Sequence, residues 1–587
     1  MAAVSPRRPG WLPSAAVLLV QVGLAFALFA PAWAHATSTL VGNQIDSGPH
    51  AWQLHWTSFA LSHGSSPLTT DWLGYPHGVN LAWSTPVLIP GLLLWPVEAL
   101  AGPIVSFDLW MTLAPALTAF AAYLVLRRLV PGSRLAAALG GTLFGFSPYV
   151  LAHESAGHDN LVLLAGVPLL VLLVDELVVR QRLSPARLGL LLGGLAAVQA
   201  YLAEEVLATE AIAAACGLAV LWLVTGSALR TALTRRALRR LGQALLVAAP
   251  VFALVAGPLL WTQFLGPQHI SGSIQPRGRY VTDLANLVVP TRLQAVAPAA
   301  ATSLSDRFTG NLGEWNGYVG LPLLALCAAV AWWQRRRVLV RWAAAMAVVA
   351  TGLSLGPTLH VAGHDTHLSL PWRVLGHLPL LDNVLPSRMM GFTFLALGIV
   401  LACGVAALTA DPRRRSLRAA ATAALVALSA VALAPALPFP TRVATVPAFF
   451  TGAAVRQIPE GAVAYVLPAL QQDTNLWQLQ SGMRFRMLGG WFLGPDAHGH
   501  VQQGPVSTPL TRAVADVEAS GDVILVDPQL IAAYRAELRR DRVDAVVVTP
   551  YEPNAQAVVQ FFQILANTPP HDDGAGTFYW TGLSRAS

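Results

Sequence analysis

The stretch that decides the fold runs from residue 104 to residue 152 and reads IVSFDLWMTLAPALTAFAAYLVLRRLVPGSRLAAALGGTLFGFSPYVLA. Two apolar runs, 104–126 and 135–152, are separated by a short polar link that contains Arg127, Arg128 and Arg134. Each run approaches the length of about 20 residues that a helix needs to cross a bilayer. This stretch therefore predicts two membrane-spanning helices joined by a basic loop.

The same alternation extends outward in both directions. Hydrophobic residues make up 55% of the chain and charged residues only 11%, whereas about a quarter of the residues in an average soluble protein are charged. We therefore predict a polytopic α-helical membrane protein with about eleven transmembrane helices. The predicted spans are 13–34, 104–126, 135–152, 160–178, 188–203, 206–224, 241–261, 317–333, 338–356, 390–409 and 418–437.

The distribution of arginine predicts the orientation of these spans. Arginine clusters fall in every second gap between them, and the gap at 35–103 contains no Lys or Arg at all. Because cytoplasmic loops are enriched in basic residues, we expect a multi-pass protein of the plasma membrane. Its N-terminus, with Arg7 and Arg8, is expected to be cytoplasmic, and 35–103 is expected to be the first outer loop. The net charge of +7 follows from this topology and is not a nucleic-acid signal.

The stretch Pro86 to Leu100 is apolar, but it is short and interrupted by Pro90 and Pro96. Counting it as a span would place all the later arginine clusters outside. We therefore expect it to form an interfacial or re-entrant helix on the outer face.

After residue 437 the sequence changes character. Short β-rich runs alternate with helical stretches, which favours a small α/β domain. The predicted organisation is a transmembrane domain at 1–439 and an extracytoplasmic α/β domain at 440–587. The expected strands are 462–467, 543–549 and 577–581, and the expected helices are 510–519, 528–540 and 554–566.

The outer loops carry carboxylates at the mouths of apolar spans, where they are costly unless paired, hydrated or bound to a metal. Asp46 lies in the first loop, and the second loop reads His153-Glu154-Ser155-Ala156-Gly157-His158-Asp159-Asn160. Trp52, Trp56 and Trp72 suit sugar stacking, but an interfacial aromatic belt is the favoured interpretation. The third loop contains Glu204 and Glu205, which are either functional carboxylates or a water-exposed hairpin end, and Glu210 in the next span is a functional candidate.

These features resemble the GT-C membrane glycosyltransferases, especially the actinobacterial members. The resemblance rests on Asp46 in a long first loop, the acidic second loop, about eleven spans and a C-terminal outer domain. Two further segments, Leu385-Pro386-Ser387-Arg388 and 481–486 (SGMRFR), look like recurrent segments of that group. Asp46 is a lone acid where several relatives have two adjacent acids, and the sequence has no Trp-Trp-Asp motif of the oligosaccharyltransferase kind.

The resemblance implies transfer of a sugar from a polyprenyl-phosphate donor, with inversion at the anomeric carbon, to a glycan, lipid or protein acceptor. Asp46 would be the general base, since positioned carboxylates perform this role. Arg277, Arg279 and Arg388 would bind the departing phosphate, because guanidinium groups pair with phosphate bidentately. Arg388 could equally anchor a helix end among lipid headgroups. We include Glu205 among the substrate-binding residues.

Glu154, His158 and Asp159 are the remaining catalytic candidates. Together with Asp46 they could bind Mg²⁺ or Mn²⁺, with Asp46 and Asp159 as the expected ligands. They could instead cap the helices on either side of Gly157. The two histidines are one residue too far apart for the HExxH helix of a zinc protease. A transporter or flippase of an envelope precursor and a non-catalytic assembly protein are the alternative functions.

Overall fold

The computed structural model describes residues 12–43, 46–84, 86–225, 227–378, 381–410, 417–523 and 527–584. Arg7 and Arg8 lie outside the described residues. The chain packs into two compact units, each of which is described by itself. The first comprises Met1–Gln44, Phe107–Ala256 and Gln275–Arg442, and the second comprises Ile45–Ser106, Gly257–Ile274 and Val443–Ser587.

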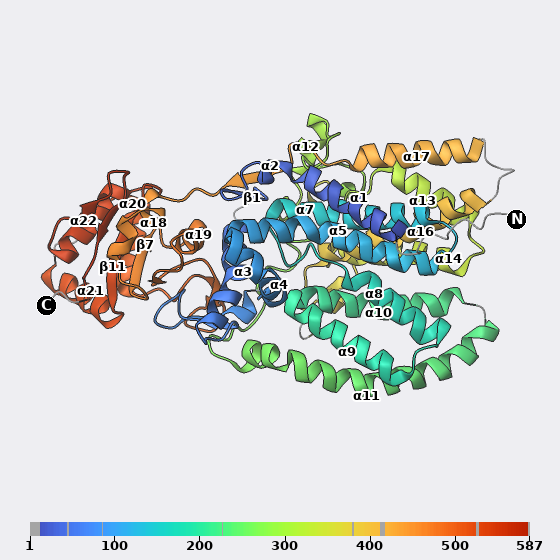
Figure 1. Cartoon of the computed structure of the whole chain (residues 1–587), viewed down its shortest axis with the longest axis horizontal. Coiled ribbons are helices and arrows are strands. Elements are labelled where there is room, and N and C mark those ends of the chain that lie inside the picture. The colour runs from blue at the N-terminus through green and yellow to red at the C-terminus, as the bar shows by residue number, and fades with distance from the viewer. Residues whose placement is uncertain are drawn as a thin grey trace, which may run out of the picture. The chain divides into compact units, whose positions relative to one another are not determined.

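Apolar helices make up most of the first unit (Figure 1). They are α1 (Leu12–Leu28), α5 (Pro103–Leu129), α6 (Arg134–Gly145), α7 (Pro148–Ala156), α8 (Gly166–Asp175), α9 (Pro185–Leu202), α10 (Glu204–Val224), α11 (Ser227–Leu265), α13 (Leu321–Trp333), α14 (Val338–Ser354), α16 (Met390–Ala410) and α17 (Leu417–Leu433). Small residues allow some of these helices to approach closely, as they do in membrane proteins. A Cβ on Gly140 of α6 would lie 2.5 Å from the carbonyl oxygen of Gly398 in α16, so α16 packs directly against α6.

Within the part of the chain that the structure describes, six helices are long and apolar enough to cross a membrane: Pro103–Leu129, Arg134–Ala156, Pro185–Leu202, Glu204–Val224, Arg235–Leu265 and Pro386–Ala410. They confirm the predicted class of helical membrane protein. Four other predicted spans coincide with shorter apolar helices, namely Leu12–Leu28, Leu321–Trp333, Val338–Ser354 and Ala420–Leu433. The total of about eleven spans stays a prediction.

Two short helices from the predicted first loop pack together in the second unit. Helix α4 (Leu88–Ala101) has 14 residues and lies against α3 (Ser47–Ser62). Ser58 Oγ of α3 donates a hydrogen bond to Glu98 of α4 at 2.5 Å, and His55 Nδ1 lies 2.9 Å from the same carboxylate. At 1.5 Å per residue, α4 is about 21 Å long, which is shorter than the hydrocarbon core of about 30 Å.

Helix α3 also explains why the interfacial-belt interpretation of two tryptophans is wrong. The rings of Trp52 and Trp56 stack at 5.3 Å, and both residues are buried inside the second unit. Gln478 of α19 (Asp473–Gln480) accepts a hydrogen bond from Trp52 Nε1 at 2.6 Å and donates to the carbonyl of Trp72 at 2.9 Å. These tryptophans fill a protein core because α19 covers the helix face that carries them.

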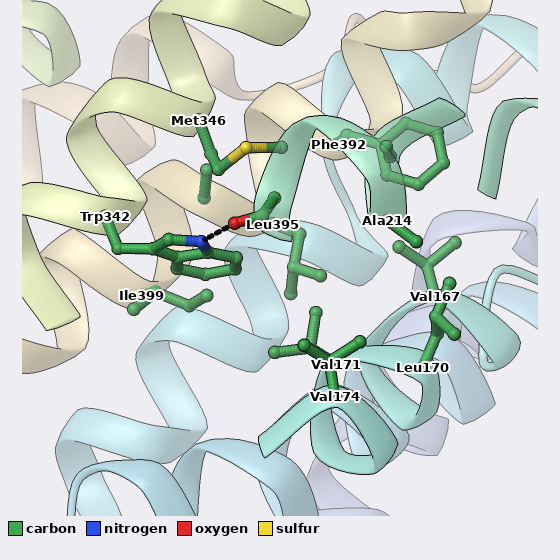
Figure 2. A pocket seen from close by; sticks show the side chains of 13 residues that line it. Val167, Leu170, Val171, Val174, Ala214, Trp342, Met346, Phe392, Leu395 and Ile399 are labelled. Carbon is green, nitrogen blue, oxygen red and sulfur yellow. Dashed lines mark hydrogen bonds between the residues drawn. The ribbon is translucent and has the colours of Figure 1, made fainter. Parts of the chain in front are cut away.

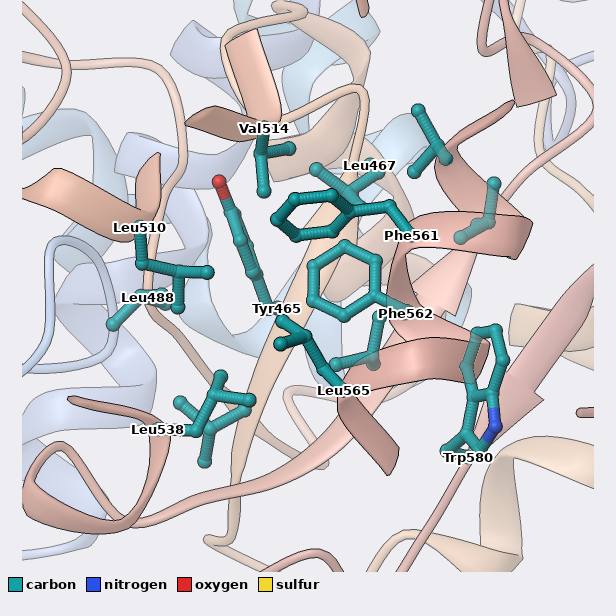
Figure 3. Packing of buried hydrophobic residues seen from close by; sticks show 14 of the residues in the cluster. Tyr465, Leu467, Leu488, Leu510, Val514, Leu538, Phe561, Phe562, Leu565 and Trp580 are labelled. Atoms are coloured by element: carbon teal, nitrogen blue, oxygen red, sulfur yellow. The ribbon is translucent and has the colours of Figure 1, made fainter. Parts of the chain in front are cut away.

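The second unit also contains a five-stranded sheet in the order β12-β13-β11-β7-β8. Its two central strands, β7 (Val463–Leu467) and β11 (Val543–Val548), are parallel and wholly buried, which explains why all their residues except Asp544 are apolar. The outer strands are β8 (Arg486–Met487), β12 (His571–Asp572) and β13 (Phe578–Trp580). Three helices, α20 (Pro509–Ser520), α21 (Pro528–Arg540) and α22 (Ala555–Ala566), coincide with the helical stretches expected from the sequence. Figure 3 shows the shared core, in which Tyr465 of β7 and Phe562 of α22 pack edge to face at 5.9 Å.

Candidate active site

Helix α7 ends in a turn that brings two histidines together. Gly157 adopts a left-handed conformation with φ of +81°, which a residue with a side chain rarely adopts. Its N–H donates to the carbonyl of Glu154 at 3.2 Å, and the N–H of His158 donates to the carbonyl of His153 at 3.0 Å. These two bonds are the Schellman pattern of a helix C-terminus. The chain therefore folds back so that His158 lies beside His153.

The two imidazole rings meet a carboxylate from a distant loop. The Nδ1 atoms of His153 and His158 are 3.0 Å apart. One ligand atom from each histidine and one from Glu314 all lie within 4.8 Å of one another. Among the described residues this is the one group of three or more such side chains that could hold a metal ion, and it includes neither Asp46 nor Asp159. Two imidazoles and a carboxylate form a donor set that suits zinc and related ions.

Arg388 lies next to this group and is held between two carboxylates. It belongs to a short 3-10 turn, η4 (Pro386–Met389), which leads into α16. Its Nη1 atom forms a short ion pair with Glu205, and its Nη2 atom lies 3.0 Å from Glu314 Oε1. Both terminal nitrogens of this guanidinium are therefore already engaged with protein carboxylates.

The two carboxylates are themselves fixed by the segment that carries Arg388. Glu205 Oε1 accepts a hydrogen bond from the backbone N–H of Leu385 at 2.6 Å. Glu314 Oε2 accepts one from the hydroxyl of Ser387 at 2.8 Å. The positions of both acids are therefore set by the Leu385-Pro386-Ser387-Arg388 segment.

Glu314 is buried yet ionised. Burial alone would raise the pKa of its carboxyl group, but the charge of Arg388, the neighbouring His153 and His158, and the hydrogen bond from Ser387 more than offset it. The net effect lowers the pKa of Glu314 to about 2. Glu314 therefore carries a negative charge throughout the physiological pH range.

Three more acids are fully buried in the same unit: Asp108, Glu154 and Asp159. Asp108 Oδ1 accepts a hydrogen bond from the backbone N–H of Val41 at 2.8 Å. Neither carboxylate oxygen of Glu154 has a hydrogen-bond partner among the described residues. Because buried polar groups are nearly always satisfied, an unpartnered carboxylate marks this place for a proton, a cation or a ligand.

The segment before Asp46 packs on the end of α7. Gly42 has φ of +86°, and a Cβ at this position would lie 2.8 Å from the carbonyl oxygen of Glu154 and 2.9 Å from the nitrogen of Gly157. Asn43 donates its backbone N–H to the carbonyl of Ser155 at 3.1 Å. Glycine at position 42 is thus required for this close approach.

Asp46 itself belongs to the second unit, whereas the other acids of the candidate site belong to the first. It directly precedes α3, and its Oδ1 atom accepts a hydrogen bond from Gln472 Nε2 at 3.2 Å. Gln472 is buried, so the orientation of Asp46 is set from within its own unit.

A polar cavity of about 440 Å³ shares a wall with the segment before Arg388. Leu385 and Pro386 line it on one side, and Arg277, Arg373 and His377 supply basic or titratable groups. Arg279 does not line the cavity. Its Cζ atom lies over the ring of Tyr280, 5.4 Å from the ring centroid. Asp382 also lines the cavity, which therefore holds both basic and acidic side chains.

A second cavity, of about 490 Å³, lies among α8, α10, α14 and α16 (Figure 2). Its lining is almost wholly apolar and includes Val171, Leu395 and Ile399. Trp342 forms one wall and donates its Nε1–H to the carbonyl of Gly217 at 2.9 Å. This cavity suits a hydrocarbon group and offers no chemistry of its own.

The structure brings some of the sequence-predicted residues together and separates others. Glu205 and Arg388 form a pair, and His158 lies beside the α7 end that carries Glu154. Arg277 lines the polar cavity, and Arg279 stacks on Tyr280. Sequence reasoning did not select His153, Ser387 or Glu314 as site residues. Glu314 was detectable as a carboxylate in the Gly- and Asn-rich loop TGNLGEWNG at 309–317, on the predicted outer side.

Several solved structures are similar to this chain. The arabinofuranosyltransferase AftD from mycobacteria matches with a TM-score of 0.51 at 16% identity, over 98% of this chain and 40% of AftD. An AftD mutant matches with a TM-score of 0.50 at 17% identity, over 92% of this chain and 37% of that one. An oligosaccharyltransferase from Archaeoglobus fulgidus matches at 11% identity with a TM-score of 0.44, over 94% of this chain and 71% of that one. This chain thus spans about two fifths of the length of AftD.

No curated protein sequence matches the chain. A family described as "Domain of unknown function (DUF6311)" matches residues 18–382, which is more than half of the chain. The fold shared with AftD confirms the predicted GT-C architecture. The protein therefore belongs to the DUF6311 family and has the fold of the GT-C membrane glycosyltransferases.

Proposed function

We propose that this protein is a membrane glycosyltransferase that moves a sugar from a polyprenyl-phosphate donor to an envelope glycan or lipid acceptor at the outer face of the membrane. One observation carries the proposal. In a GT-C fold, ionisable groups gather at the ends of several candidate spans, where Glu205 begins α10, Arg388 precedes α16 and His153 lies near the end of α7. Buried charges in such positions mark functional sites in membrane proteins.

Asp46 is proposed as the general base that takes the proton of the acceptor hydroxyl as it attacks the anomeric carbon. The hydrogen bond from Gln472 orients one oxygen of this carboxylate.

The donor phosphate is assigned to Arg277 in the polar cavity. Arg388 is a weaker candidate, because Glu205 and Glu314 already occupy both of its terminal nitrogens. An arginine without such partners can offer two parallel N–H donors to a phosphate. Arg388 then acts as a positioning residue that holds Glu205 and Glu314 in place.

The proposed topology places this chemistry outside the cell. The N-terminus is cytoplasmic, α4 does not cross the membrane, and the loops that carry Asp46, His158 and Glu314 face the outer side, as does the C-terminal region. The charge rule supports this arrangement through the arginine-free stretch at 35–103.

The test uses the purified full chain in lipid nanodiscs, a panel of radiolabelled polyprenyl-phosphate sugars, and an envelope fraction as acceptor. We expect one donor to transfer its label to acceptor material, and Asp46→Asn protein to transfer none. In parallel, proteoliposomes report whether labelled lipid crosses the bilayer. Lipid crossing without transfer, or no transfer from any donor, would overturn the proposed function.

A further inference from the structure

The guanidinium of Arg388 has little to offer a phosphate. Both of its terminal nitrogens already pair with protein carboxylates, one with Glu205 and the other with Glu314. The fully buried acids Glu154 and Asp159 lie in the same α7 segment and turn, and any charge on them makes the buried centre around Arg388 more negative. In the low dielectric of a buried site, carboxylates repel an anion strongly. A further cation would offset this repulsion.

The geometry of the α7 turn supplies a place for that cation. Two neutral imidazole nitrogens 3.0 Å apart can share one proton, or both can bind one metal ion. Tetrahedral zinc with Zn–N bonds of about 2.0–2.1 Å places two ligand nitrogens about 3.3 Å apart, close to the observed distance. Glu314 offers the third ligand atom from within 4.8 Å.

The three ligands are held by their surroundings and not by one another alone. The Gly157 turn fixes His158 against His153, and the ring of Tyr149 packs edge-on against His153 at 4.6 Å. Ser387 and Arg388 fix the two oxygens of Glu314, each of which retains a lone pair for a metal. Such outer contacts orient the ligands of metal sites in general.

We propose that His153, His158 and Glu314 bind a metal ion of the zinc class, and that this ion makes the buried centre receptive to a phosphate group. A divalent ion bound to Glu314 would add two positive charges beside the guanidinium of Arg388. This site differs in ligands and in metal class from the oxygen-rich Mg²⁺ or Mn²⁺ site expected at Asp46 and Asp159. The metal site stands on geometry alone, whereas its phosphate-binding role rests on the proposed function.

The experiment measures metal binding directly. Full-length protein with a histidine-free affinity tag is stripped with a chelator and titrated with Co²⁺, whose visible absorption reports its ligands. We expect one Co²⁺ per chain, displaced by Zn²⁺ but not by millimolar Mg²⁺. His158→Asn and Glu314→Gln should each weaken Co²⁺ binding at least tenfold, whereas His63→Ala, at an exposed histidine, should leave it unchanged.

Correct folding of each variant is checked by its melting temperature and its elution from size exclusion. Because Glu314→Gln also unpairs Arg388, His158→Asn is the decisive variant. Absence of Co²⁺ binding to the stripped protein, or undiminished binding by folded His158→Asn protein, would overturn the site. The phosphate-binding role of the ion is tested by measuring the affinity for inorganic phosphate with and without Zn²⁺. This role is overturned if Zn²⁺ does not increase that affinity. Intact metal binding without sugar transfer would contradict the proposed function and leave the metal site standing.

Discussion

Arg388 Nη2 lies 3.0 Å from Glu314 Oε1, although the two residues are 74 positions apart in the chain. Both are largely buried, and Arg388 also pairs with Glu205. The guanidinium thus neutralises part of the charge of two acids that would otherwise repel each other in a region poor in water. This arrangement makes Arg388 a structural requirement of the site before it contributes to any chemistry.

Arg388→Gln should destabilise the protein, because it leaves Glu205 and Glu314 close together without a counter-charge. Removing one partner of a buried ion pair typically costs about 3–5 kcal/mol. We expect a clearly lower melting temperature in detergent, measured by intrinsic tryptophan fluorescence. The matched control is Arg292→Gln, whose partner Asp306 is 40% exposed; breaking such a surface pair costs about 0–1 kcal/mol. Equal melting temperatures for the two variants would contradict the structural role of Arg388.

Gly157→Ala should disrupt the histidine pair. A side chain in the left-handed conformation costs about 1–2 kcal/mol, and relaxation of the turn would move His158 away from His153. We expect loss of Co²⁺ binding with only a modest fall in melting temperature. Gly482→Ala is the control, because Gly482 has a similar φ of +70° and no neighbour within 4 Å of an added Cβ. If both variants bind Co²⁺ equally well, the turn does not position the histidines.

Much of the fold could be predicted because it is encoded locally. The β-rich run at 543–549 predicts the strand β11, and the lengths of the apolar runs predict the long helices. The stacking of Trp52 on Trp56 beneath α19 could not be predicted in the same way. An aromatic side chain suits a lipid interface and a protein core equally well, and only the tertiary contact distinguishes them.

In the candidate site too, locally encoded features could be predicted and tertiary contacts could not. Arg388 and Glu205 could be selected individually as charges at the ends of spans, but their pairing across 183 positions has no local signature. The meeting of His153 with His158 was encoded in the sequence, in Gly157. A spacing of five residues excludes a shared helix face, but it fits a Schellman turn with glycine one residue before the second histidine.

Asp46→Asn should abolish sugar transfer while expression and melting temperature stay unchanged. Asparagine keeps the shape of the side chain and can still accept from Gln472, but it cannot take a proton from the acceptor hydroxyl. Loss of a general base reduces the rate by roughly 10²–10⁴-fold. Asp71→Asn serves as the control, since Asp71 is exposed and pairs with Arg486 at 2.8 Å in the same unit. A turnover of Asp46→Asn protein equal to that of the control would remove Asp46 from the mechanism.

Stability should depend on pH through Glu518 in the second unit. Burial, the nearby charge of Glu552 and a hydrogen bond between the two carboxyl groups raise the pKa of Glu518 to about 8. The folded protein therefore holds this proton more tightly than the unfolded chain, whose glutamate pKa is about 4.3. The stabilisation is fully present below the unfolded pKa and is lost as the pH rises towards 8.

Glu518→Gln should therefore reduce the fall in melting temperature between pH 5 and pH 8.5, measured on the full chain in detergent. Glu460→Gln, at an exposed glutamate, should keep the wild-type pH profile. If Glu518→Gln protein loses stability over this range as steeply as the wild type, the shared proton is not the cause.

The proposed topology predicts which residues react with a membrane-impermeant thiol reagent in intact cells. Single cysteines are placed in a background lacking Cys216, Cys327 and Cys403. Ser155 and Ser305 are fully buried and would be protected on either side of the membrane, so exposed positions are used instead. The labelled positions are Ser65, Ser303 and Ser507, with Ala186 as the cytoplasmic control.

We expect Ser65→Cys, Ser303→Cys and Ser507→Cys to react from outside, and Ala186→Cys to react only after the cells are permeabilised. The reason is the short helix α4: if its 14 residues do not cross the membrane, the segments before and after it keep the sidedness given by the arginine clusters. If α4 does cross, Ser65 and Ser303 must lie on opposite sides. Labelling of Ser65 with protection of Ser303 would therefore place Glu314 and the two histidines in the cytoplasm, away from any acceptor at the outer face.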